Sequence, residues 1–124
     1  LVPVVRFADN KSLSHISSEV KSLAVKAKSK QLQPSEWEGN TFTISNLGMF
    51  GIDEFTAIIN PNDSCILAVG GIKNTPVIKN GEIVPGNLMK LTLSCDHRIV
   101  DGATGSSFLK TLKELIEDPI KILV

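Results

Sequence analysis

The densest group of reactive side chains in this sequence lies in residues 94–102, where a histidine has charged neighbours on both sides. Leucines alternate with polar residues just before it, which is the period of a half-buried strand. If that strand continued through His97, the imidazole would lie on the apolar side, where partial desolvation keeps it neutral and able to act as a base. A core histidine that donates to a carbonyl is an equally good interpretation of the position alone. The neighbouring Asp96, Arg98 and Asp101 favour the functional interpretation.

Asp101 permits three interpretations, which the sequence leaves open. Its carboxylate could orient His97, four residues earlier, or pair with Arg98, three residues earlier. It could also cap the helix expected from Gly102, because aspartate is a preferred N-cap residue. Cys95 falls on the apolar face of its strand, so we interpret it as a packing residue in preference to a nucleophile beside His97.

Ser45 ends a segment of alternating polar and apolar residues, 41–45, and enters a tight turn at Asn46-Leu47-Gly48. A hydroxyl in this position usually caps the turn. It could equally donate a hydrogen bond to a developing oxyanion if another element brought the histidine nearby. The sequence lacks the G-x-S-x-G nucleophile elbow, so a conventional serine hydrolase is not supported.

The elements that must position these residues follow from periodicity and from turn signals. We expect an α/β two-layer sandwich, in which helices pack on a mixed sheet. Apolar residues at intervals of three and four predict a helix at about 12–30 and another from about 102 to the Asp118-Pro119 stop. Asn80-Gly81 predicts a hairpin. The predicted strands are residues 1–7, 41–45, 54–59, 64–69, 77–78, 83–84 and 88–95, and an apolar tail follows at 120–124.

The composition is that of an ordinary globular domain. The 124 residues are 42% hydrophobic and 21% charged, which excludes intrinsic disorder, and the formal net charge of +0 argues against a nucleic-acid binder. No apolar run reaches the ~20 residues that cross a bilayer, so we expect no membrane protein. Two cysteines, Cys65 and Cys95, cannot form the disulfide framework of a secreted protein, which favours a reducing compartment. With His15 and His97 as the only histidines, we expect no metal site.

Lysines outnumber acidic residues on the predicted helix at 12–30. We interpret this surface as a solvated face, and the lysines near its end also suit the helix dipole. The alternative is a binding patch for an acidic partner domain or for the phosphates of a nucleotide cofactor.

Two segments resemble the signatures of a known family. Residues 93–103, which read L-S-C-D-H-R-I-V-D-G-A, resemble the D-H-R-x-x-D-G active-site motif of the dihydrolipoyl acyltransferases, the core enzymes of the 2-oxo acid dehydrogenase complexes. Residues 42–51 resemble that family's second signature in its pyruvate-complex form, and residues 59–61 and 65–70 are similar to the segment between the two. The signatures occur in the right order, so the resemblance covers essentially the whole chain.

The resemblance implies a fold like that of chloramphenicol acetyltransferase, assembled as a homotrimer whose active site lies between subunits. Coenzyme A would enter this site from one end, and a lipoyl arm carried on a separate domain would enter from the other. His97 would be the general base, Ser45 the oxyanion donor, and Asp101 a residue that shapes the site. The residues that contact coenzyme A are not assigned by the resemblance.

The reaction implied is transfer of an acetyl group between dihydrolipoamide and coenzyme A within the pyruvate dehydrogenase complex, in the bacterial cytoplasm or the mitochondrial matrix. The turn that follows Ser45 favours acetyl over succinyl. Trimers would build a larger symmetric core that works with lipoyl domains and the other components of the complex. A non-catalytic scaffold of the same complex is the alternative from another class, and a Ser45–His97–Asp101 hydrolase is disfavoured by the missing elbow.

The sequence also departs from the family pattern. It begins Leu1-Val2-Pro3-Val4, without Met or a charged segment, so we expect a piece of a longer protein. The resemblance implies that residues 1–124 are the C-terminal part of the catalytic domain, without its N-terminal part and without lipoyl and subunit-binding domains. Asn62-Asp63 replaces a more usual Pro-Gln or Pro-Glu pair, and we expect no chemical consequence of this change.

Overall fold

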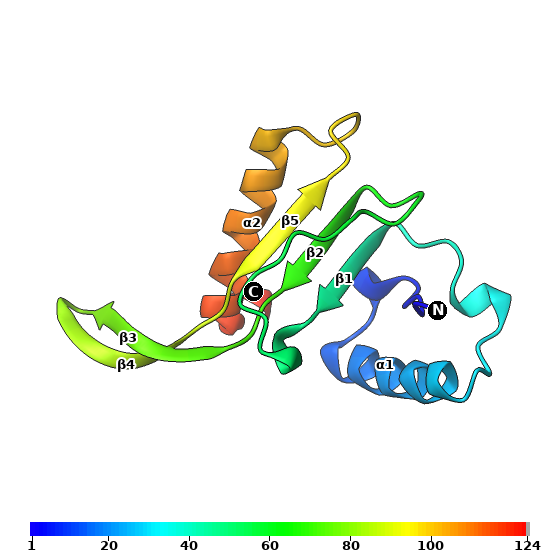
Figure 1. The fold of residues 1–124 in the computed structure, drawn as a ribbon, viewed down its shortest axis with the longest axis horizontal. Helices are drawn as coiled ribbons and strands as arrows, with labels where there is room; N and C mark the ends of the chain where they lie inside the picture. The colour runs from blue at the N-terminus through cyan, green and yellow to red at the C-terminus, as the bar shows by residue number, and fades with distance from the viewer. Residues whose placement is uncertain (124) are drawn as a thin grey trace. The chain divides into compact units, whose positions relative to one another are not determined.

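The computed structural model describes residues 1–123 and divides into two compact units, Leu1–Asn40 and Thr41–Val124 (Figure 1). Val124, the last residue of the predicted apolar tail, lies outside the described residues. Among the residues described, no helix is long and apolar enough to cross a membrane.

The first unit is built around α1, Leu13–Lys28, which agrees with the predicted helix to within two residues at its ends. The Ser12 hydroxyl caps this helix by accepting a hydrogen bond from the His15 backbone N–H at 3.3 Å. Lys26 and Lys28 lie in the last turn, where cations stabilise the helix dipole. Two short 3-10 segments accompany the helix: η1, Ala8–Asn10, and η2, Pro34–Glu36.

The predicted strand at residues 1–7 is wrong. The segment is irregular, Leu1 is 80% exposed, and Phe7 ends it in the left-handed region at φ 51°. A strand needs a ladder of hydrogen bonds from a neighbouring strand. Here the backbone N–H of Val4 donates to the carbonyl of Glu36 at 2.8 Å, and that residue belongs to η2 instead of a strand.

The second unit contains a three-stranded mixed sheet and a separate two-stranded hairpin. In the sheet, β2 (Cys65–Val69) is central, β1 (Phe42–Asn46) pairs with it in parallel, and β5 (Leu91–Cys95) pairs with it antiparallel. The first four residues of β2 are each at most 6% exposed. Because β2 pairs with a neighbouring strand at each edge and its side chains are buried, it forms the core of the unit.

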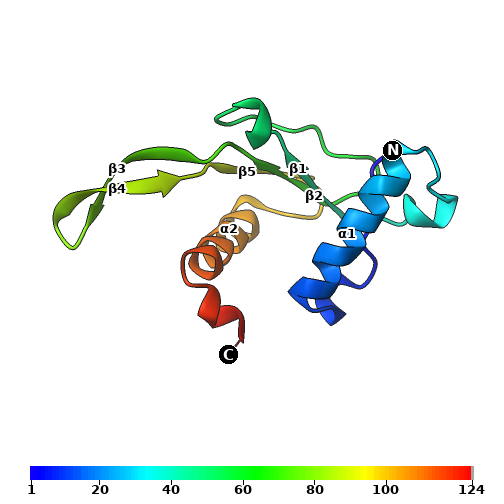
Figure 2. The same ribbon diagram turned by 90° about the horizontal axis from the view of Figure 1, so that it is seen from below.

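A single long helix, α2 (Gly102–Glu117), covers one face of this sheet (Figure 2). The ring of Phe108 on this helix lies 5.8 Å from the ring of Phe42 on β1. Because side chains alternate along a strand, Phe42 faces the helix, whereas Thr43 and Ser45 point to the opposite face. The arrangement confirms the predicted α/β layers with a mixed sheet. The short segment η4, Pro119–Leu123, follows the helix.

The hairpin predicted at Asn80-Gly81 is confirmed. It joins β3 (Lys73–Lys79) to β4 (Glu82–Leu88), and φ is positive at both turn residues, as a type I′ turn requires. Leu88 therefore belongs to the hairpin, and the strand predicted from residue 88 begins at Leu91.

The predicted strand at residues 54–59 is also wrong. Exposed and half-buried residues alternate along this segment as the sequence pattern implies, yet the segment joins neither sheet. Alternation determines which side chains face inward, but a strand also requires a partner backbone.

Candidate active site

His97 lies in a turn of residues 96–100 that directly follows β5; we call it the histidine turn. The backbone N–H of Asp96 donates to the Ser64 carbonyl at 2.8 Å, which extends the β2–β5 ladder by one bond. The carbonyl of Asp96 then accepts from the N–H groups of Ile99 (3.0 Å) and Val100 (2.9 Å). The condition that would have placed His97 on the apolar side is not met: β5 ends at Cys95, the chain turns at Asp96, and His97 is exposed.

The two side chains that flank His97, Asp96 and Arg98, form an ion pair with each other. The guanidinium of Arg98 donates three hydrogen bonds to the Asp96 carboxylate: Nε to Oδ1 at 3.0 Å and to Oδ2 at 3.2 Å, and Nη2 to Oδ2 at 2.7 Å. The Arg98 backbone N–H also donates to Oδ1 at 3.0 Å. These bonds from the Arg98 side chain, and then from its backbone, lower the pKa of Asp96 to about 2. The carboxylate is therefore charged at neutral pH, and the histidine between the partners is held in a fixed turn.

Asp101 caps α2. Its Oδ1 accepts a hydrogen bond from the Thr104 backbone N–H at 2.7 Å, and this bond lowers the pKa of the Asp101 carboxyl. Of the three interpretations of Asp101, the cap is the one observed, and the pairing of Arg98 with Asp101 is wrong because Arg98 binds Asp96.

Ser45 lies near the end of β1, half-buried, and pairs with Ala68 across the sheet. The turn that follows is capped by Asn46, whose Oδ1 accepts a hydrogen bond from the Gly48 backbone N–H at 2.9 Å. Asn46, and not Ser45, is therefore the residue that caps the turn, so the turn-capping interpretation of Ser45 is wrong.

Residues 46–51, which we call the serine turn, are held by backbone contact. A Cβ placed on Gly48 would lie 2.8 Å from the Gly70 carbonyl oxygen, and one on Gly70 would lie 1.9 Å from the Asp53 carbonyl oxygen. Only glycine allows backbones to approach this closely. Steric fit between the serine turn and the end of β2 therefore fixes the chain beyond Ser45.

Ser45 and His97 do not meet within one chain. Ser45 pairs with Ala68, which pairs with Thr92, so His97 lies five residues beyond the level of Ser45. From Thr92 to the end of β5 at Cys95, a rise of ~3.3 Å per residue gives about 10 Å along the sheet before the histidine turn begins, and β1 and β5 are two strand spacings apart across the sheet. β1 and β5 run in opposite directions (Figure 1), so the residues that follow their C-terminal ends lie at opposite ends of the sheet.

A buried polar cluster was not predicted from the sequence. Asn60 Nδ2 donates to Thr43 Oγ1 at 2.8 Å, and the Thr43 hydroxyl donates to Oδ2 of Asp63. Thr43 and Asp63 are 8% and 5% exposed. Asp63 thus has a structural role, because it ties the start of β2 to β1; the expectation that Asn62-Asp63 has no chemical consequence stays a prediction. The sequence feature that could have indicated this cluster is the turn before β2. In the structure Asn62 of this turn adopts φ 74°.

The two cysteines lie on the β2–β5 ladder, and both are free thiols. Cys65 is buried, and the pKa of Cys95 is raised, first by burial and then by the neighbouring Cys65 thiol. A raised pKa disfavours the nucleophilic thiolate, which supports the packing role predicted for Cys95.

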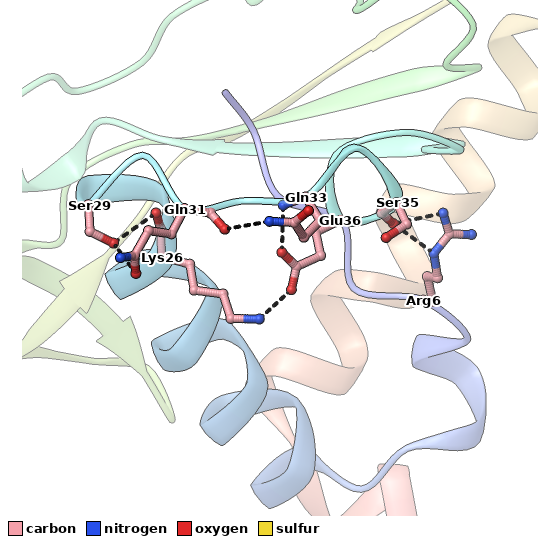
Figure 3. Close-up of polar contacts among 7 residues, drawn as sticks. All are labelled: Arg6, Lys26, Ser29, Gln31, Gln33, Ser35 and Glu36. Atoms are coloured by element: carbon pink, nitrogen blue, oxygen red, sulfur yellow. Dashed lines mark hydrogen bonds and ion pairs between the residues drawn. The ribbon is translucent and has the colours of Figure 1, made fainter.

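Part of the lysine face of the first unit has a structural role. Lys26 on α1 forms an ion pair with Glu36 in η2, and a second Glu36 oxygen accepts from the Gln33 backbone N–H at 2.8 Å (Figure 3). The Gln33 bond, followed by the Lys26 bond, lowers the pKa of Glu36. Figure 3 also shows Arg6 bound to the Ser35 carbonyl. These contacts fold residues 1–40 together, so Lys26 belongs to the unit's own packing.

The whole chain is similar to a known family of catalytic domains. The family described as 2-oxoacid dehydrogenases acyltransferase (catalytic domain) matches residues 1–124. The chain is 47% identical over 124 residues to the dihydrolipoyllysine-residue acetyltransferase component of the pyruvate dehydrogenase complex of Rickettsia conorii, covering 100% of this chain and 30% of that protein. It is 49% identical to the mitochondrial component of Dictyostelium discoideum, with 98% and 20% covered.

Solved structures show the same fold. The Azotobacter vinelandii dihydrolipoamide acetyltransferase matches with a TM-score of 0.94 and 41% identity, covering 100% of this chain and 51% of that one. The cubic core of the pyruvate dehydrogenase multienzyme complex matches with a TM-score of 0.94 and 40% identity, again over 51% of its chain. The chain thus spans about half of these structures and less than a third of the curated relatives. Since the family match covers every residue, the chain belongs to the 2-oxoacid dehydrogenase acyltransferase family.

Proposed function

We propose that this member of the 2-oxoacid dehydrogenase acyltransferase family transfers an acetyl group between dihydrolipoamide and coenzyme A within the pyruvate dehydrogenase complex. His97 is the general base and Ser45 the oxyanion donor. The names of the relatives from Rickettsia and Dictyostelium support acetyl as the group transferred. One of them is bacterial and the other mitochondrial, which supports the bacterial cytoplasm or the mitochondrial matrix as the place of action.

The observation that carries the proposal is the spacing of three residues. In the Azotobacter vinelandii enzyme, a serine, a histidine and an asparagine have been studied for their role in the catalytic mechanism. The interval from that serine to that histidine equals the interval from Ser45 to His97, and the asparagine follows the histidine by four positions, as Asp101 follows His97.

The asparagine of that relative also bears on Asp101. The side-chain amide of asparagine does not act as an acid or a base near neutral pH. Asn and Asp nevertheless serve equally well as N-cap acceptors. The observed bond from the Thr104 N–H to Asp101 needs only an acceptor oxygen. Asp101 therefore acts as a positioning residue that fixes the start of α2 just after the histidine turn, and it takes no proton in the reaction.

The distance between Ser45 and His97 supports a site shared between copies. Within one chain the two residues lie at opposite ends of the sheet, because β1 and β5 are antiparallel to each other. A site that uses both requires His97 from one copy and Ser45 from the next. Such head-to-tail contacts can close into a ring, and the ring that the family resemblance implies is a homotrimer. A lipoyl arm carried on a separate domain and coenzyme A reach this shared site as substrates.

The chemistry at the shared site follows from the two side chains. The imidazole of His97 accepts the proton of the coenzyme A thiol while the sulfur attacks the acetyl carbonyl carbon of acetyl-dihydrolipoamide. The Ser45 hydroxyl donates a hydrogen bond to the oxyanion that forms. When the bond between the acetyl carbon and the dihydrolipoyl sulfur breaks, the leaving thiolate takes the proton back from His97. No acyl-enzyme is needed, because both thiols meet in one site.

Assembly of trimers into a larger core is supported by η4. Ile120 and Leu123 are 70% and 84% exposed in this segment. Adjacent apolar side chains left in water usually mark a partner surface, and each one buried contributes ~1.5–3 kcal/mol. The similar solved structure that is a cubic core supports such an assembly. Replacing Ile120 and Leu123 with serine in the full-length protein should leave trimers in light scattering, and an intact large particle would exclude η4 as the connector.

The test of the proposal is complementation between two inactive variants. Full-length His97→Ala and Ser45→Ala proteins should each keep no more than about 1% of the wild-type rate. They are mixed one to one, dissociated and reassembled. Random mixing restores both residues in about a quarter of shared sites, so about a quarter of the wild-type rate of acetyl-dihydrolipoamide formation returns. A site within a single chain gives no recovery, because every chain lacks one residue.

An assay of the wild-type protein distinguishes the proposed acetyltransferase from the scaffold alternative. A scaffold assembles normally and shows no transfer from acetyl-CoA to dihydrolipoamide in the wild-type protein. A hydrolase would instead release acetate in the absence of an acceptor thiol. Dithiol-dependent transfer without acetate release is the result expected from the proposal.

A further inference from the structure

Cys65 and Cys95 face each other directly across the β2–β5 ladder. The bonds from Asp96 N–H to the Ser64 carbonyl (2.8 Å) and from Gly70 N–H to the Lys90 carbonyl (2.9 Å) set the phase of this ladder. Both place the cysteines at a non-hydrogen-bonded pair, where Cα atoms are ~4.5 Å apart. A disulfide accepts Cα separations from ~4.4 Å upward. The backbone therefore already holds the two residues within bonding range.

The surroundings keep the two thiols together. They point to the sheet face covered by α2, where a Cβ placed on Gly105 would lie 3.3 Å from the Cys95 Sγ. The helix backbone thus limits movement of this sulfur away from the sheet. Burial and the Cys65 thiol raise the pKa of Cys95, so the pair reacts slowly at neutral pH and faster as pH rises. Cys65 is 6% exposed, so the oxidant in this inference is a small one.

We propose that Cys65 and Cys95 form a modification site, which a peroxide converts to a reversible intrachain disulfide that slows acyl transfer at His97. One thiol loses its proton, the thiolate attacks a peroxide oxygen and the O–O bond breaks, which gives a sulfenic acid and a hydroxide that takes up the released proton to form one water. The second thiol attacks the sulfenic sulfur and releases a second water. The two sulfurs lose two electrons in total, and the peroxide gains them.

The effect on transfer follows from the position of Cys95, the last residue of β5. A disulfide draws the Cβ atoms to ~3.8 Å, closer than the ~4.5–5.5 Å of ordinary cross-strand pairs. The strain falls on the next residue, Asp96, whose N–H extends the ladder and whose carboxylate holds Arg98. Displacement of the histidine turn by about 1 Å lowers turnover by roughly ten- to a hundredfold. This part of the inference rests on the proposed function.

The experiment exposes the full-length protein to hydrogen peroxide at pH 7 and pH 9, blocks the remaining thiols and digests it with trypsin. Cleavage after Lys30, Lys73, Lys90 and Arg98 places the cysteines in peptides 31–73 and 91–98. We expect these two peptides to be linked, to separate with dithiothreitol, and to link faster at pH 9. Both cysteines still blocked as free thiols after treatment overturn the proposal.

Activity gives the second readout. Turnover of the treated wild-type protein should fall roughly ten- to a hundredfold and return with dithiothreitol. The Cys65→Ser variant should keep its turnover under the same treatment, and Cys65→Ala replaces it if the serine variant does not fold. Linked peptides with unchanged turnover, or equal sensitivity of the variant, overturn the switch. If untreated protein transfers no acetyl group, the proposed function fails, and the peptide map still decides the cysteine chemistry.

Discussion

The histidine turn and the serine turn are held by different forces. In the histidine turn, charged side chains make the contacts: Arg98 forms an ion pair with Asp96, and Asp101 caps the following helix. In the serine turn, backbone atoms of Gly48 and Gly70 approach so closely that no side chain fits between them. Charged contacts can be weakened by a change of pH, by salt or by a single substitution. The close backbone contacts at the glycines are instead lost when a methyl group is added, because it would overlap a backbone carbonyl oxygen. In the shared site that we propose, each half thus has its shape before two copies meet.

The strongest test of the histidine turn removes its central residue. The His97→Ala variant of the full-length protein should transfer acetyl groups ~100- to 10,000-fold more slowly, because a general base is lost. Initial rates with acetyl-CoA and dihydrolipoamide measure the loss. Assembly should be intact, because His97 is exposed and its neighbours hold the turn.

The matched control for this variant is His15→Ala. His15, the other histidine, is an exposed residue of α1, so its loss should leave the rate unchanged. Near-normal turnover in a correctly assembled His97→Ala protein would remove His97 from the mechanism.

The equivalent test of the serine turn is Ser45→Ala. Its kcat should fall by ~100-fold or more with little change in KM, because the hydroxyl acts on charge that exists only in the transition state. Steady-state kinetics with each substrate varied in turn separates the two constants. Ser107→Ala removes an exposed hydroxyl from α2 and serves as the control. An effect mainly on KM would make Ser45 a binding residue.

The steric nature of the serine turn is tested by Gly70→Ala. The added methyl group meets the Asp53 carbonyl oxygen, so the free energy of unfolding should fall by about 1–3 kcal/mol or more, as overpacking does. Urea denaturation measures the change. Gly102→Ala is the control: its Cβ meets no atom within 4 Å at the start of α2, and it should stabilise the protein by up to ~1 kcal/mol. Equal stability of the two variants would contradict the glycine contact.

The electrostatic nature of the histidine turn is tested by Asp96→Asn, with an expected loss of turnover of roughly tenfold. The pKa of Asp96 in the folded protein is about 2, below the ~3.9 of an unfolded aspartate. The ion pair therefore stabilises the protein above about pH 4, and this stabilisation is lost as pH falls through 2. The difference in Tm between wild type and Asp96→Asn should be constant from pH 5 to 8 and should close toward pH 2.

A second substitution separates charge from geometry. Arg98→Lys keeps the positive charge but cannot make two parallel hydrogen bonds to Asp96, so its effect should be smaller than that of Asp96→Asn. A Tm difference that does not depend on pH would show that the pair does not hold the turn.

Local features of this protein could be predicted from its sequence because neighbouring residues determine them. The spacing of apolar residues predicted α1 and α2, Asn80-Gly81 predicted the hairpin turn, and the cap was one of the interpretations of Asp101. The two signatures also indicated the family, which the match over the whole chain confirmed. Helix periodicity, turn geometry and capping all depend on contacts within a few positions of the chain.

Features that depend on a distant partner were decided by the tertiary structure. Residues 1–7 and 54–59 have the pattern of strands, but neither joins a sheet, and the exposure of His97 depends on where β5 ends. The burial of Asp63 and the close contact of Gly48 with Gly70 each join segments far apart in the sequence. The separation of Ser45 from His97 follows from β2 lying between β1 and β5, parallel to one and antiparallel to the other. Residue type and spacing select the side chains capable of chemistry, but strand order and direction place them at opposite ends of the sheet, because backbone pairing is a long-range interaction.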